Sequence, residues 1–200
     1  MTDKVYLYID GTNLFAGQNE IFGPNKHLSF KYLIEEINQL FPVSKIFFYA
    51  SYMNQKNRSK LTTEKKRLIL AEALFYREVL YTKNVLFYKG HRSRTSGKEK
   101  GVDVHLSVDI VKDIFFKRCN RIAIMTGDAD IIYPLEVVKL LKTPTFALFL
   151  PNRFSLAMSY KADKAYVLNF NNKFKSNRKL PKQLKIVAIK KPRMVNIRGK

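Results

Sequence analysis

Apolar residues follow two alternating patterns along the chain. Short, nearly continuous apolar runs are typical of strands buried on both faces, and they occur at residues 4–9, 43–51, 85–89, 121–125, 145–150 and 166–170. Between them, apolar residues recur with a helical period, which predicts helices at 30–40, 61–81, 102–116, 131–141 and 155–163. This alternation predicts an α/β fold, a Rossmann-like three-layer α/β/α sandwich with a mainly parallel sheet.

Carboxylates stand where apolar strands are expected to end. Asp10 follows the first run in VYLYIDGTN, Asp128 follows IAIMTG, and Asp103 begins the helix predicted after Gly101. Ligands of open parallel sheets bind outside the carboxyl ends of the strands. Mg²⁺ and Mn²⁺ prefer oxygen ligands, and without a cation such carboxylates would repel one another. The pattern therefore predicts a metal site; the scattered histidines and the lone Cys119 offer no zinc set.

Several neighbouring polar residues have two interpretations each. Asn13 can orient Asp10 or a phosphate, or it can cap a helix before Leu14. Thr126 can assist Asp128, or it can be a strand-end residue chosen for β propensity.

Other acids have structural interpretations. Asp10 before Gly11 is also typical of a turn, and Asp130 is placed to cap the helix expected at 131–141. Asp109 lies six positions after Asp103, about 240° around a helix, so the two should not share a face. Asp113 is expected to be solvated or paired with Lys117.

The charge balance narrows the class of partner. The 200 residues suit one domain with a tail and include 37 Lys and Arg against 16 Asp and Glu, a net charge of +21. Hydrophobic content of 46% excludes global disorder. A charge this large favours a polyanion, above all nucleic acid. We expect no membrane association, because no apolar stretch approaches about 18 residues. A single cysteine and no signal-peptide pattern indicate a cytoplasmic protein.

Basic residues gather in two loops and at the end of the chain. Residues 53–60 and 89–101 are polar and basic, and the second loop leads directly to Asp103. We expect its cations to bind RNA, although a solvated loop would have the same composition: Lys89, Arg92, Arg94, Lys98 and Lys100. Residues 171–200 hold eleven Lys and Arg and no acid, while 184–189 and 194–197 are apolar enough for a strand or hairpin.

Three motifs together carry a family resemblance. DGTN at 10–13, KGVDVHLSVD at 100–109 and TGDADIIYPL at 126–135 resemble the NYN domain family, in the LabA-like branch of the PIN-like nucleases. The resemblance covers roughly residues 4–170, so we predict a nuclease domain at 1–170 and a basic extension at 171–200. Thr126 and Ile131 stand where Ser and Phe are usual in that family, but neither change removes a carboxylate.

The resemblance implies a PIN-like α/β/α fold and a metal-dependent nuclease that acts on RNA. Carried over residue by residue, it implies that Asp10, Asp103 and Asp128 bind Mg²⁺ or Mn²⁺. The full predicted site consists of catalytic Asp10, Asn13, Asp103 and Asp128, with supporting Asp109, Thr126 and Asp130. A haloacid dehalogenase phosphatase would need a nucleophilic Asp where Tyr8 stands, and no phosphate-cradling glycine motif occurs.

The sequence thus predicts an endoribonuclease that hydrolyses phosphodiester bonds with water activated by Mg²⁺ or Mn²⁺. Two alternatives remain open: a noncatalytic RNA-binding protein with the same fold, and a nuclease that acts on DNA. The oligomeric state is also open, a homodimer included.

Overall fold

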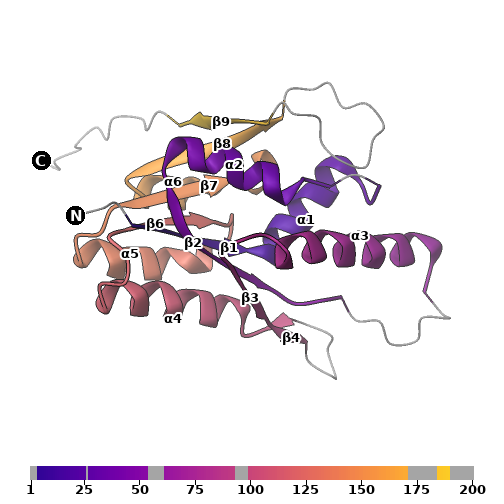
Figure 1. Cartoon of the computed structure of the whole chain (residues 1–200), viewed down its shortest axis with the longest axis horizontal. Coiled ribbons are helices and arrows are strands. Elements are labelled where there is room, and N and C mark those ends of the chain that lie inside the picture. The colour runs from indigo at the N-terminus through magenta and orange to yellow at the C-terminus, as the bar shows by residue number, and fades with distance from the viewer. Residues whose placement is uncertain (1–3, 26, 54–60, 93–98, 171–183, 190–200) are drawn as a thin grey trace, which may run out of the picture.

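A seven-stranded sheet forms the centre of the molecule (Figure 1). The structure is a computed structural model and describes residues 4–25, 27–53, 61–92, 99–170 and 184–189. The strands lie in the order β3-β2-β1-β6-β7-β8-β9, with the bounds β1 Val5–Asp10, β2 Val43–Ala50, β3 Val85–Lys89, β6 Arg121–Met125, β7 Thr145–Phe149, β8 Lys164–Phe170 and β9 Leu184–Ala188. All neighbours pair in parallel except β8 and β9, which pair antiparallel.

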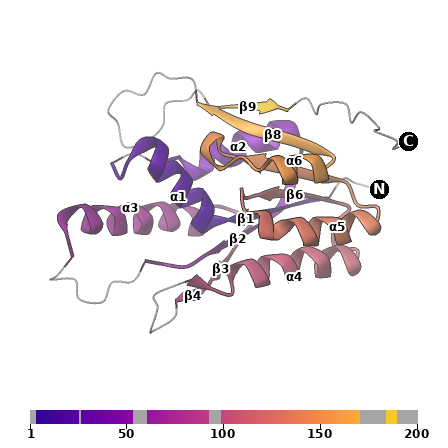
Figure 2. The ribbon, with the colours of Figure 1, turned by 180° about the vertical axis from the view of Figure 1, so that it is seen from behind.

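Helices cover both faces of the sheet (Figures 1 and 2). One layer consists of α1 Gly11–Phe22, α2 Phe30–Leu40 and α3 Thr63–Leu80, and the other of α4 Val102–Phe115, α5 Ile132–Leu140 and α6 Leu156–Lys161. Every residue of β1 is buried, as expected of a strand with helices on both sides. Leu7 and Ile9 face the first layer, while Tyr6 and Tyr8 face the second. The predicted three-layer α/β/α fold with a mainly parallel sheet is confirmed.

The predicted strands and helices are present, with ends that differ by a few residues, but α1 was not predicted. Its sequence, GTNLFAGQNEIF, contains residues with poor helix propensity. A Cβ on Gly11 would lie 2.1 Å from Cε1 of Phe48, so the helix needs glycine there to approach β2. Close packing against the sheet therefore determines the composition of this helix more than local propensity does.

A topological switch point lies between β1 and β6. The chain passes from β1 to β2 and β3 in one direction across the sheet, and then returns to place β6 on the other side of β1. Because the connections leave these strands in opposite directions, their carboxyl ends open a crevice that commonly holds ligands in such folds. Asp10 is the last residue of β1, and Thr126 directly follows β6.

Smaller elements complete the described structure. His91–Arg92 (β4) and Glu99–Lys100 (β5) form a separate antiparallel pair before α4. Residues 129–131 and 151–153 form 3₁₀ turns. The apolar run at 184–189 contributes β9, whereas 194–197 lies outside the described residues. Among the described helices, none has the length and apolar character that a membrane span requires.

Candidate functional site

Asp10 is a buried carboxylate at the end of the central strand. Its side chain is the N-cap of α1: Oδ1 accepts a hydrogen bond of 2.9 Å from the backbone N–H of Asn13. Oδ2 accepts a hydrogen bond of 3.0 Å from the hydroxyl of Thr126. A carboxylate at a helix N-terminus is also favoured by the helix dipole. These hydrogen bonds satisfy both oxygens of a carboxyl group that is only 5% exposed.

Thr126 and Asn13 tie the ends of β1 and β6 together. The Thr126 hydroxyl, which donates to Asp10, also accepts a hydrogen bond of 3.1 Å from the backbone N–H of Asp128. The amide oxygen of Asn13 accepts a hydrogen bond of 3.1 Å from the backbone N–H of Gly127. Both residues thus position the site. Asn13 does not cap α1, because Asp10 occupies that place.

Asp128 caps the 3₁₀ turn after β6, a role that the sequence had suggested for Asp130. Oδ1 of Asp128 accepts a hydrogen bond of 3.0 Å from the backbone N–H of Asp130. Asp130 lies inside that turn, and its side chain is exposed. The predicted capping role of Asp130 is therefore wrong, because the helical chain begins two residues earlier than expected.

Asp103 enters the site from the other helical layer. It lies in the first turn of α4, two residues after Gly101, whose backbone has a positive φ of 85°. Such a φ favours glycine, and it turns the chain from β5 into the helix. Asp103 is exposed, in contrast to Asp10.

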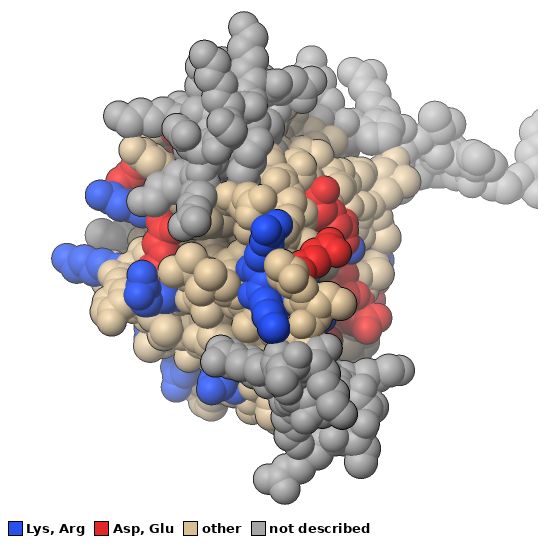
Figure 3. Space-filling model, turned by 90° about the vertical axis from the view of Figure 1, so that its right-hand side faces the viewer, with Lys and Arg blue, Asp and Glu red and all other residues tan. Residues whose placement is uncertain are grey.

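These side chains line one pocket of about 260 Å³ at the carboxyl end of the sheet. Its lining consists of Asp10, Thr12, Asn13, Ala16, Lys100, Gly101, Asp103, Asp128 and Arg153. Figure 3 looks onto this end of the molecule and shows acidic side chains grouped on its right, with Lys and Arg side chains at its centre and left. The structure therefore brings together the three acids and the amide that the sequence singled out.

The donor set suits a hard cation without forming a closed cage. Carboxylate and amide oxygens are the ligands that Mg²⁺ and Mn²⁺ prefer. Within the described part of the chain, no three Asp, Glu, His or Cys side chains are grouped closely enough to hold a metal ion. Mg²⁺ is commonly held by only one or two carboxylates, with water and substrate phosphate as its other ligands. The pocket fits that open mode of binding better than a preformed cage of three acids.

A comparison with known protein families identifies the family to which this chain belongs. The model of the NYN domain matches residues 4–169. The chain belongs to the NYN domain family. Its three acidic motifs all lie inside the matched range, which also contains every strand of the main sheet except β9 and the last residue of β8.

A solved structure shares the overall fold of this NYN domain. A protein of unknown function from Vibrio parahaemolyticus is similar over 84% of this chain and 93% of its own, at 15% identity and a TM-score of 0.58. A candidate UDP-N-acetylglucosamine 2-epimerase from Listeria monocytogenes aligns over 84% of this chain and 40% of its own, at 5% identity and a TM-score of 0.39. At these identities the first likeness concerns the fold alone. The comparison with curated proteins finds no match.

Asp109 and Asp113 of the NYN domain do not line the pocket. Their side chains instead connect helix α4 to the sheet. Asp109 accepts a hydrogen bond of 2.8 Å from the Tyr49 hydroxyl and forms an ion pair with Lys112. Asp113 is buried, accepts a hydrogen bond of 2.9 Å from the Tyr8 hydroxyl and pairs with Arg118 at 2.9 Å. The expectation of a solvated Asp113 or a pair with Lys117 is therefore wrong.

The predicted RNA-binding cations fall into three groups. Lys100 lines the pocket. Lys89 is exposed at the end of β3, where its Nζ lies 5.0 Å from the centre of the Tyr52 ring. The side chain of Arg92, and the whole of Arg94 and Lys98, lie outside the described residues.

Sequence reasoning missed two residues of the pocket, Thr12 and Arg153. The Thr12 hydroxyl accepts a hydrogen bond of 3.3 Å from the backbone N–H of Ser51, which links α1 to the end of β2. Arg153 follows the buried strand β7, so its place in the sequence resembles that of the acids. A search for any charged residue after a buried strand, and not for acids alone, would have found it.

Proposed function

We propose that this NYN domain is a metal-dependent endoribonuclease of the LabA-like branch, and that its pocket hydrolyses phosphodiester bonds of RNA. The observation that carries the proposal is the convergence of Asp10, Asp103 and Asp128 on one pocket at the switch point of the sheet. Three sequence motifs far apart in the chain meet there, and apart from the cations Lys100 and Arg153 the polar side chains that line the pocket offer oxygen ligands. A site of that composition suits a divalent cation and a phosphate group.

The proposed cation is Mg²⁺ or Mn²⁺, held by pocket carboxylates among Asp10, Asp103 and Asp128. When bound, it would supply a Lewis acid that activates water for attack and balances charge on the phosphate. The chain itself fixes the carboxylates: Asn13 and Thr126 hold Asp10, and the backbone of Asp130 holds Asp128. Because these carboxylates are already held in place, the site would not need to reorganise during the reaction.

Positive charge in and around the pocket supports RNA as the partner. The chain carries a net charge of +21, and Lys100 brings a cation into the acidic pocket itself. Lys89 lies near the same end of the sheet, beside the ring of Tyr52. Cations around a small acidic site can hold the backbone of a strand while one phosphate enters the pocket.

A circular RNA tests this proposal, because only internal cleavage can open a circle. The chain is incubated with the circle in Mg²⁺, in Mn²⁺ and in excess EDTA, and the products are separated on a denaturing gel. We expect linear products with either metal and none in EDTA. Cleavage that persists in EDTA would contradict the metal requirement. A single-stranded DNA circle in a parallel reaction tests the alternative substrate, and faster opening of the DNA would transfer the proposal to DNA.

A noncatalytic RNA-binding protein is the second candidate. It is favoured by the lack of a three-acid metal group within the described residues, and by the hydrogen bonds that both oxygens of Asp10 accept. If the circular RNA binds tightly but remains closed in Mg²⁺ and Mn²⁺, this candidate replaces the nuclease.

A further inference from the structure

We propose that Arg153 is a phosphate-binding residue of the pocket, which grips the nucleic-acid backbone beside the carboxylates. The inference rests on the proposed function for its substrate, but on separate contacts for its geometry. Among the described residues that line the pocket, Arg153 is the one arginine and Lys100 is the only other cation. The two come from different parts of the fold, the 3₁₀ turn after β7 and strand β5 before α4.

The backbone of Arg153 is held firmly against the acidic loop. A Cβ added to Gly127 would lie 2.1 Å from the carbonyl oxygen of Arg153 and 2.8 Å from its carbonyl carbon. Gly127 directly precedes Asp128, and its N–H is bound by Asn13. The turn that carries Arg153 therefore packs on the same residues that position the carboxylates.

The side chain of Arg153 is fixed along its length. Its Cγ lies 2.7 Å from the place that a Cβ on Gly17 of α1 would occupy. One terminal nitrogen forms an ion pair with Glu20. The amide of Asn152 donates hydrogen bonds of 3.0 Å to Glu20 and to the carbonyl oxygen of Gly17. The guanidinium is thus oriented before any ligand arrives.

The guanidinium keeps an unused donor. Nε of Arg153 is buried and has no hydrogen-bond partner among the described residues. A buried N–H without an acceptor is destabilising, and buried polar atoms of this kind are uncommon. Because Nε faces Gly17 of α1, a phosphate in the pocket that Arg153 lines would be met by the terminal N–H groups of the guanidinium fork, which match phosphate geometry.

This arrangement gives Arg153 a defined part in the reaction. The carboxylates of the pocket carry negative charge, and they would repel a phosphate unless a cation lay nearby. A guanidinium there would bind the phosphate in the ground state and stabilise the charge that develops as the bond breaks. Lysine at the same position would keep the charge but lose the fork.

Binding in EDTA separates a phosphate contact from a structural role. The affinity of a fluorescent single-stranded RNA is measured between about 50 and about 200 mM salt for the full chain and three variants. They are Arg153→Gln, Arg153→Lys and, as a matched control, Arg77→Gln, which removes an exposed arginine of α3 outside the pocket. Thermal melting of each variant establishes that it folds.

We expect Arg153→Gln to reduce the slope of log affinity against log salt by about 0.7, the value for one lost phosphate contact on a single strand. Arg153→Lys should keep the slope, yet its single-turnover cleavage in Mn²⁺ should fall by about 10-fold or more because the fork is lost. Arg77→Gln should change neither. An Arg153→Gln variant that melts earlier but keeps the parent slope would overturn the proposal and leave Arg153 a structural residue.

Failure of the proposed phosphate contact can be distinguished from failure of the nuclease proposal. If the parent chain cleaves no RNA while Arg153→Gln still lowers the slope, hydrolysis is wrong and the phosphate contact stands. If the parent cleaves RNA and Arg153→Gln keeps both the parent slope and the parent cleavage rate, hydrolysis stands and the phosphate contact is wrong.

Discussion

At the scale of single residues, one hydroxyl connects two of the pocket acids. Thr126 donates to the side chain of Asp10 and accepts from the backbone of Asp128, and it is 2% exposed. A buried group with both a donor and an acceptor role fixes two partners at once, so a change there should affect both folding and the site. From the sequence, Thr126 could assist Asp128 or could simply be a strand-end residue. Its hydrogen bonds in the structure suit the role of assisting Asp128.

We expect Thr126→Val to lower the free energy of unfolding by about 1 to 3 kcal/mol, because two buried polar groups lose a partner. Its cleavage rate should fall by about 10-fold or more, as with other residues that orient ligands of a metal site. Urea unfolding and a single-turnover cleavage assay measure the two effects. Thr126→Ser, which keeps the hydroxyl, is the matched control; equal losses in both variants would contradict the role of the hydroxyl.

Gly127 is a second residue at which close packing leaves no room for a larger side chain. Its missing Cβ leaves room for the carbonyl oxygen of Arg153, which belongs to backbone and cannot rotate away. We expect Gly127→Ala to destabilise the fold by about 1 to 3 kcal/mol through this overpacking. Thermal or urea unfolding measures the loss. Parent-like stability would show that the turn at 151–153 moves aside freely.

At the scale of elements, hydrogen bonds from the sheet set the position of α4, the helix that brings Asp103 to the pocket. Tyr8 of β1 and Tyr49 of β2 donate to Asp113 and Asp109, which lie one turn apart on α4. Burial raises the pKa of both tyrosines, and the negative charge of the partner aspartates raises it further. Both phenols therefore stay protonated in the folded chain well above their ordinary pKa of 10.0.

A raised folded pKa makes stability sensitive to alkaline pH. Below about pH 10 both states keep the phenols protonated; above it the unfolded chain loses protons that the folded chain keeps. The free energy of unfolding should then fall by about 1.4 kcal/mol per pH unit for each such tyrosine.

Urea unfolding of the parent and of Tyr49→Phe is measured between about pH 8 and 11. The difference between the two curves separates the effect of the tyrosine on stability from that of the lysines, which titrate in the same range. The variant should be less stable near pH 8, because it lacks the bond to Asp109, and should lose less stability as the pH rises. Parallel curves for the parent and Tyr49→Phe would contradict the assigned hydrogen bond.

The elements also show what a sequence can and cannot predict. Strands buried on both faces and helices with a regular apolar period were predicted because their side chains meet the core in a repeating way. Helix α1 was missed because Gly11 and Gly17 are required by close approaches of Phe48, Leu150 and Arg153, which only the folded chain reveals. Asp113 was misjudged for the same reason, since its partners Tyr8 and Arg118 are set by the packing of α4 on the sheet.

At the scale of the whole molecule, an acidic pocket lies in a strongly basic chain. The net charge of +21 should make association with RNA strongly dependent on salt. If six or more phosphates are contacted, the affinity should fall by about 10³ or more between 50 and 200 mM salt. Fluorescence anisotropy in EDTA measures this loss. An affinity that changes little over this range would contradict a binding mode based on phosphate contacts.

The position of the site, unlike its chemistry, follows from the topology. Asp10 and Asp128 meet because β1 and β6 are parallel neighbours, and Asp103 joins them because α4 packs across β1 and β2. The sequence predicted this meeting from strand ends. A search confined to acids passed over Arg153, which follows β7 in a turn that packs against Gly127.

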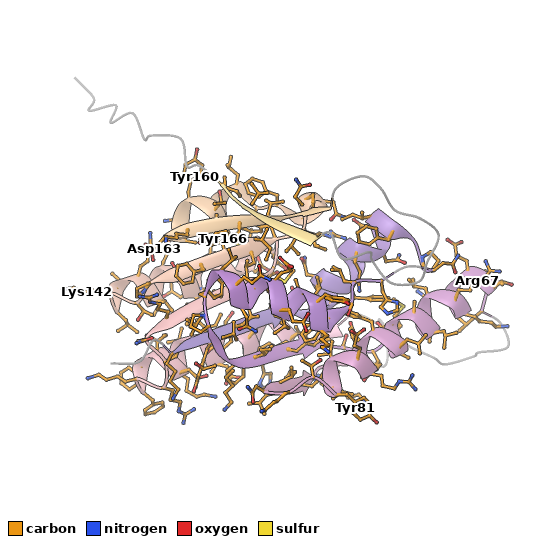
Figure 4. All side chains as sticks on the ribbon, turned by 45° about the horizontal axis from the view of Figure 1, so that its top comes forward. Arg67, Tyr81, Lys142, Tyr160, Asp163 and Tyr166 are labelled. Carbon is orange, nitrogen blue, oxygen red and sulfur yellow. The ribbon has the colours of Figure 1, made fainter. Side chains whose placement is uncertain are left out.

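The most direct test of the account replaces pocket acids by their amides and measures single-turnover cleavage of RNA in Mn²⁺. Asp10→Asn keeps an oxygen that can cap α1, and Asp128→Asn changes an acid nearer to solvent. Asp163→Asn is the matched control: its carboxylate accepts hydrogen bonds from Thr145 at the opposite end of the sheet, away from the pocket (Figure 4). We predict that both pocket variants lose cleavage by about 10²-fold or more while Asp163→Asn cleaves like the parent. Unchanged cleavage in Asp10→Asn and Asp128→Asn would contradict the account.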